Sequence, residues 1–267
     1  MRTRLSLSLL IAFSLLGFIW PFLVPSQGLA DRASWFFLAS TPIAVALIVA
    51  LVSQEELGSK KIALLGTLTA LIAALRPLGI GAIGIEPMWF ALILAARAMG
   101  PTFGFLLGSL SMLLSALLTG GVGPWLAYQV CAAALIGTGV ALIPSSLRGR
   151  SEVFALVLYG VIASAIFGIA MNLQFWPWAL GSGTELSYLP GAPLTENLTR
   201  FFSYHFLSSL AWDIPRAILT ATLIAVAAHP VLNALRRLQM RSRFVEPHEI
   251  EELVLANVRA KRPSVDR

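Results

Sequence analysis

The chain has 267 residues, of which 57% are apolar and only 12% are charged, and its mean hydropathy is +0.81. A soluble domain carries roughly 25% charged residues, so this chain has too few polar side chains to cover a surface that faces water. Composition therefore excludes an ordinary soluble domain and predicts an integral membrane protein. The formal net charge of +6 raises the question of a nucleic-acid partner, which the positions of the basic residues decide.

Eight apolar runs follow one another along the chain. Each is a candidate transmembrane helix, because a helix needs about 20 mainly apolar residues to cross a bilayer. The first run follows Arg2 and Arg4, as in a signal peptide, but no small-x-small cleavage motif follows it closely, so we favour a retained helix. The sequence therefore predicts an all-α integral membrane protein. The runs are residues 5–24, 35–52, 62–75, 88–99, 102–118, 125–143, 153–176 and 204–228.

The basic residues lie mainly on one side of this predicted bundle. Connections alternate between the two sides, and 15 of the 19 basic residues fall on the side that also holds both termini. Positive residues stay cytoplasmic, so both termini of this multi-pass protein of the plasma membrane are predicted to be cytoplasmic. The orientation of the protein in the membrane then explains its net positive charge, and no nucleic-acid partner is expected. Anionic lipid head groups are expected to contact the juxtamembrane cluster of Arg236, Arg237, Arg241 and Arg243.

The outer connections of the predicted bundle are longer and less regular than the inner ones. Residues 76–86 (RPLGIGAIGIE) contain three glycines and one proline and cannot continue a helix, and residues 177–200 form the longest connection. Extended loops on one face favour a ligand lid there. The short run 88–99 predicts a cavity at its outer end. We also expect Arg76 and Glu86 to pair across the first loop.

Polar and aromatic side chains gather at the outer ends of the predicted helices. An aromatic belt at the lipid interface accounts for some of the tryptophans, but it does not account for amides within apolar helices. Such amides are expected to turn inward, either to bond helix to helix or to contact a ligand. Aromatic walls with a few fixed amides suit an uncharged, partly planar organic solute. The set comprises Glu86, Trp89, Trp125, Tyr128, Gln129, Asn172, Gln174, Trp176, Trp178, Tyr204, His205, Trp212 and Asp213.

The sequence gives little support to catalysis or to self-driven transport. It has no nucleophile motif in a suitable setting, no Gly-x-x-x-x-Gly-Lys loop for a nucleotide and no metal-ligand spacing. Its single cysteine, Cys131, excludes an intramolecular disulfide. Asp213 and Arg216 lie three residues apart on one helix face and are expected to form a structural salt bridge. We therefore predict no catalytic residues, no metal and no cofactor.

Small residues recur every four positions in the run after Lys61, at Gly66, Ala70 and Ala74. This spacing places them on one helix face, where they allow another helix to approach closely. The partner is either a neighbouring helix of the same chain or a separate subunit.

The segment from about residue 60 to 228 resembles the substrate-specific (S) component of energy-coupling factor (ECF) vitamin transporters. The resemblance rests on the small-residue helix, the loop RPLGIGAIGIEP, the stretch MGPTFGFLLGSLSMLLSALLTGGVGPW and a last helix near WDIPRA. It implies a six-helix substrate-binding core at residues 56–230. Two extra N-terminal transmembrane helices at 1–55 then precede this core, and a basic cytoplasmic tail at 231–267 follows it.

The resemblance also implies a division of labour. Such a component is not an enzyme; it captures a vitamin or related micronutrient on the outer face, and a corrinoid is one candidate. A transmembrane coupling (T) subunit and two ATPase subunits drive uptake. Gly66, Ala70 and Ala74 would form the docking face, and residues 76–86 the lid. A stand-alone secondary transporter or a membrane-embedded enzyme is the alternative. The implied substrate pocket comprises Glu86, Trp89, Trp125, Gln129, Asn172, Gln174, Trp176 and Asp213.

Overall fold

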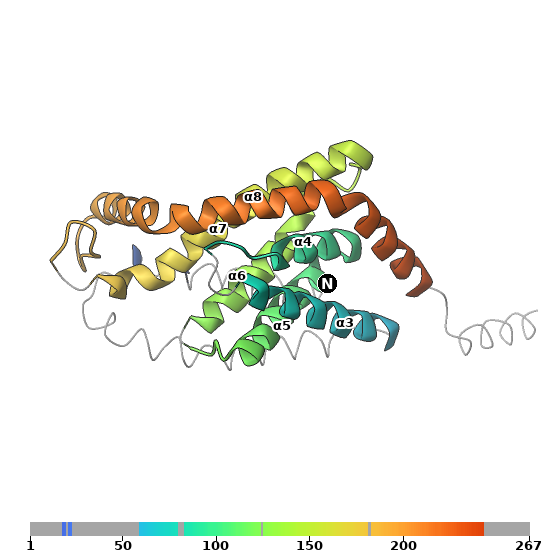
Figure 1. Cartoon of the computed structure of the whole chain (residues 1–267). Helices are drawn as coiled ribbons and strands as arrows, with labels where there is room; N and C mark the ends of the chain where they lie inside the picture. The colour runs from blue at the N-terminus through green and yellow to red at the C-terminus, as the bar shows by residue number, and fades with distance from the viewer. Residues whose placement is uncertain are drawn as a thin grey trace, which may run out of the picture.

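The computed structural model describes residues 18–19, 21–22, 59–79, 83–123, 125–180 and 183–242. This part of the chain is all-helical and has no strand (Figure 1). The two predicted N-terminal helices, apart from four helical residues at 18–22, and the tail beyond 242 lie outside the described residues. The elements are α3 (Ser59–Leu75), η1 (Arg76–Gly79), α4 (Met88–Met99), α5 (Pro101–Thr119), α6 (Leu126–Gly139), η2 (Val140–Leu142), α7 (Gly149–Ala179) and α8 (Leu194–Ser242).

Four of the described helical segments are long and apolar enough to cross a membrane. They span Ser59–Gly79, Pro101–Thr119, Gly149–Pro177 and Leu194–Met240. This finding agrees with the prediction of a helical membrane protein. The helices α4 and α6 are apolar but shorter.

Helix α4 lies at the centre of the described bundle. It contacts α3, α5, α6, α7 and α8, and most of its 12 residues are buried. Around it, α7 packs along α8, and α5 packs along α6 and against α3. Gly100, with φ of 101°, and Pro101 at the start of α5 make a tight turn between α4 and α5.

Glycines bring α5 and α6 into backbone contact. A Cβ atom added to Gly104 would lie 2.5 Å from the carbonyl oxygen of Gly137, and one added to Gly108 would lie 2.4 Å from that of Ala133. The four-residue spacing on both helices is the packing device of membrane helices, since small residues let the backbones approach. The glycines at 104, 108 and 137 therefore allow α5 and α6 to pack closely together.

Helix α8 is longer than its apolar run predicted. It begins at Leu194, which shortens the preceding connection, and it continues through Pro215 and Pro230 to Ser242. At 1.5 Å per residue its 49 residues would extend about 70 Å if straight, but its last part turns away from the main direction (red in Figure 1). Leu232 and Leu235 in this part are buried in the main core, so the start of the predicted tail belongs to the folded bundle.

Candidate binding site

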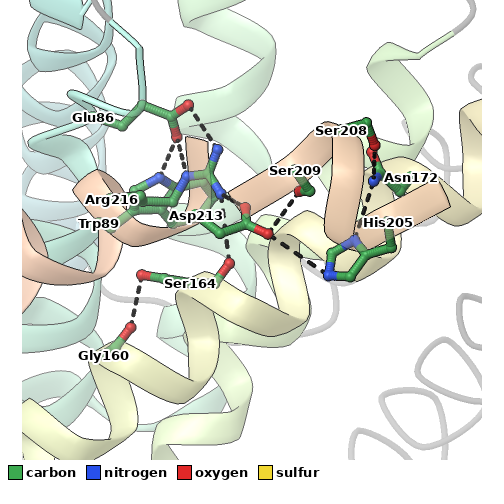
Figure 2. A network of polar contacts seen from close by, with 10 residues as sticks. All are labelled: Glu86, Trp89, Gly160, Ser164, Asn172, His205, Ser208, Ser209, Asp213 and Arg216. Carbon is green, nitrogen blue, oxygen red and sulfur yellow. Dashed lines mark hydrogen bonds and ion pairs between the residues drawn. The ribbon is translucent and has the colours of Figure 1, made fainter. Parts of the chain in front are cut away.

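A network of polar side chains connects the loop before α4 with α4, α7 and α8 (Figure 2). We call it the Glu86 network. Four of the implied pocket residues belong to it, namely Glu86, Trp89, Asn172 and Asp213. Its members are Glu86, Trp89, Ser164, Asn172, His205, Ser208, Ser209, Asp213 and Arg216.

Arg216 is the centre of the Glu86 network, and its side chain is only 5% exposed. Its Nε and Nη2 atoms donate to the two carboxylate oxygens of Glu86, at 3.1 and 3.3 Å. Its Nη1 atom donates to Asp213 at 2.6 Å, which confirms the predicted Asp213–Arg216 pair. The guanidinium also lies 4.9 Å above the centre of the Phe167 ring, a favourable contact between a cation and an aromatic face. Arg216 is therefore fixed from three sides.

Asp213 is buried and receives a second hydrogen bond, from Ser209 at 2.6 Å. The close packing of α7 against it depends on Gly168, because a Cβ atom there would lie 2.1 Å from both carboxylate oxygens. The sequence did not predict this close approach, since Gly168 lies on α7 and Asp213 on α8.

His205 and Asn172 extend the network toward the α7–α8 connection. The Nδ2 atom of Asn172 lies 3.1 Å from Nδ1 of His205 and donates to Ser208 at 3.0 Å. Because an amide nitrogen only donates, Nδ1 accepts, and the neutral imidazole carries its proton on Nε2. That atom faces Asp213 at 3.9 Å. Asn172 thus bonds α7 to α8. This is one of the two roles that the sequence predicted for amides within apolar helices.

The loop before α4 is packed directly on α8. Gly84 has φ of +68°, in the left-handed region that favours glycine, and a Cβ atom there would lie 2.3 Å from the carbonyl oxygen of Trp212. This close approach places Glu86 against Arg216 and lets Oε2 accept a 2.5 Å hydrogen bond from the Trp89 indole. Helix α4 rises only about 18 Å, against a hydrocarbon core of about 30 Å. If the Arg97 end of α4 lies at one boundary, its Trp89 end therefore lies within the membrane.

The predicted Arg76–Glu86 pair was wrong. Arg76 instead donates to Ser115 and to the side-chain oxygen of Gln129, both at 2.9 Å, and Glu86 binds Arg216. Arg76 remains within electrostatic range of Glu86. Gln129, an implied pocket residue, therefore joins α6 to the end of α3 and stands outside the Glu86 network.

Trp176 belongs to a separate aromatic cluster, in which its indole donates to the Leu186 carbonyl at 2.7 Å. Its ring lies 5.3 Å from Tyr188 and 5.4 Å from Phe201. Burial raises the pKa of the Tyr188 phenol. Two further implied pocket residues, Gln174 and Trp125, lie outside the Glu86 network: Gln174 is buried, whereas Trp125 is 46% exposed.

His205, Ser209 and Arg216 are site residues that the implied pocket did not contain. The signal for them was present, because His205, Ser209 and Asp213 follow one another at four-residue spacing and so share one face of α8. Their polarity within an apolar helix indicates an inward face.

A second polar network lies at the other end of α4, around Glu152 near the start of α7. This carboxylate is 2% exposed and accepts from Arg97 of α4 at 2.7 Å and from Arg236 of α8 at 2.5 Å. Arg97 also donates to the carbonyls of Ile143 and Pro144, just before α7. We call this the Glu152 network; it joins the Arg97 end of α4 to the last part of α8.

The predicted docking residues Gly66, Ala70 and Ala74 are all exposed on α3. A Cβ atom added to Gly66 would meet nothing within 4 Å. In the described part of the chain, the buried face of α3 is formed by other residues, namely Leu65, Thr69, Ile72 and Ala73.

Among the described residues, no group of three or more His, Cys, Asp or Glu side chains is arranged to hold a metal ion. The described region instead contains a buried ionic network around Arg216 and a buried aromatic cluster around Trp176. Comparison with known proteins found no matching family model, no matching curated protein and no matching solved structure.

Proposed function

We propose that the chain is the substrate-binding membrane subunit of an ECF-type ABC importer. It would capture a vitamin or related micronutrient, a corrinoid among the candidates. The observation that carries the proposal is the convergence of Glu86, Trp89, Asn172 and Asp213 on one network at the recessed end of α4. Polar groups at membrane depth that face the protein interior mark solute sites.

The charges at the two ends of α4 support an orientation in the plasma membrane. The end with the Glu152 network also carries Lys60, Lys61, Arg148 and Arg237. Because basic residues stay cytoplasmic, this end is the inner one in our proposal, and both termini are cytoplasmic. The Glu86 network then faces the outside, where an importer meets its solute.

The exposed face of α3 supports a partner subunit. In the described part of the chain the small residues at helix-packing spacing are exposed, and such a face suits the close approach of another transmembrane helix. We assign it to the T subunit, with two ATPase subunits supplying the energy, since this sequence has no nucleotide-binding loop of its own.

One observation favours a second candidate, a stand-alone secondary transporter. Glu86, Arg216, Asp213 and His205 form a continuous chain of ionisable groups, and such chains also serve as proton relays in carriers.

Uptake measurements separate the two candidates. The purified chain would be reconstituted in vesicles, alone with an imposed proton gradient or together with a T subunit, the ATPases and ATP. We expect uptake of the co-purifying solute, identified by mass spectrometry, only with the complete assembly. Uptake by the chain alone would establish the carrier instead.

Replacing Ala70 with tryptophan is expected to abolish ATP-dependent uptake and leave solute binding unchanged. The bulky ring would keep a partner helix from the exposed small-residue face, which lies away from the Glu86 network. Leu71→Trp is the matched control, because Leu71 is 53% exposed on another side of the same helix. Binding would be measured by calorimetry and uptake by radiolabel; wild-type uptake in Ala70→Trp would contradict the assignment of the docking face.

A further inference from the structure

We propose that Arg216 binds a carboxylate group of the solute. In the structure, the carboxylate of Glu86 occupies the position that this group would take. The inference rests on the proposed function and names the class of substrate. It replaces the sequence-based expectation of an uncharged solute.

The geometry around Arg216 is that of carboxylate recognition. Two parallel N–H donors, Nε and Nη2, face the two oxygens of Glu86, and this paired arrangement selects planar oxyanions. The third contact, from Nη1 to Asp213, does not involve Glu86. Arg216 therefore stays oriented when Glu86 leaves.

The two carboxylates differ in burial and in position. Asp213 is buried within α8, whereas the side chain of Glu86 is 25% exposed and belongs to the loop before α4. Glu86 is thus the partner that a solute can replace without unfolding a helix.

The donors that Glu86 occupies define the chemistry of the group that can replace it. Arg216 is shared by two carboxylates, and Glu86 takes two of its N–H donors while Asp213 takes the third. Removing Glu86 therefore leaves two unpaired donors on a buried guanidinium. Unpaired donors of a charged group at membrane depth are costly, and a carboxylate satisfies both of them at once.

Chemical rescue of a Glu86→Ala variant tests this inference. The purified full-length variant would be heated in detergent with 100 mM propionate, or with the uncharged isostere propionamide. We expect propionate to raise the Tm by about 3 °C, the size of shift that occupation of a weak site gives, and propionamide to have no effect. Glu86→Gln is the volume-matched control and should not respond, because its amide still fills the space beside Arg216.

Equal shifts with propionate and propionamide, or no shift with either, would overturn the inference. If Glu86→Ala does not purify in folded form, propionate present from extraction onward must restore a monodisperse protein, and failure to do so also counts against the inference. Rescue together with uptake by the chain alone would contradict the importer proposal but support Arg216 as the carboxylate receptor. ATP-dependent uptake without rescue would support the importer proposal but contradict this role of Arg216.

Discussion

Replacing Arg216 with glutamine is expected to lower the stability of the protein by about 3–5 kcal/mol, because it leaves the buried carboxylate of Asp213 without its counter-ion. For a chain of this size the loss corresponds to a fall in Tm of roughly 6–20 °C. The double variant Arg216→Gln/Asp213→Asn should recover part of the loss, since no uncompensated Asp213 charge then remains. Thermal unfolding in detergent would measure both changes.

Arg200→Gln is the comparison variant, because Arg200 pairs with Glu196 at 3.0 Å on the same helix but is less buried, with 22% of its side chain exposed and 43% of that of Glu196. A solvated pair contributes about 0–1 kcal/mol, and Arg200 also donates to the carbonyls of Thr184 and Glu185. Its loss leaves no buried carboxylate unpaired, so this variant should lose clearly less stability than Arg216→Gln. If Arg216→Gln is as stable as Arg200→Gln, the Asp213–Arg216 pair does not stabilise the bundle.

Replacing Glu152 with glutamine is expected to have an effect of similar size at the other end of α4. The change leaves the buried guanidinium of Arg97 without a carboxylate and removes the anchor of Arg236, for which we expect a loss of about 3–5 kcal/mol. The last part of α8 should also become accessible, so trypsin should cleave after Arg236 or Arg237 several times faster than in the wild type. Gel electrophoresis and mass spectrometry would follow the cleavage.

Arg148→Gln provides the comparison within the same network. Arg148 lies 3.9 Å from Glu152, but its side chain is 64% exposed, so its removal should change neither the Tm nor the cleavage rate. Equal cleavage rates in Glu152→Gln and wild type would show that Glu152 does not hold the end of α8.

The sequence predicted the elements of this fold better than their arrangement. Apolar runs placed α3 to α7 nearly correctly, because this signal is local. The length of α8 was underestimated, since proline ordinarily ends a helix. The burial of Leu232 and Leu235 and the Arg236–Glu152 pair offset the cost of Pro230, and such contacts depend on the tertiary fold.

The same distinction holds for the candidate site. The Asp213–Arg216 pair follows from a spacing of three residues, whereas 130 residues separate Glu86 from Arg216. Helices that are apolar on every side do not reveal which face turns inward. The sequence therefore identified most of the polar side chains but assigned Arg76, rather than Arg216, to Glu86.

Helix α4 carries Trp89 near its start and Arg97 near its end, and these residues belong to the Glu86 and Glu152 networks respectively. Eight residues of α-helix separate them by about 12 Å, and an intact helix does not shorten or stretch. A sliding movement of this helix along its own axis would thus displace both anchors together, so the Glu86 and Glu152 networks are mechanically coupled through the helix itself, without a relay of side chains between them.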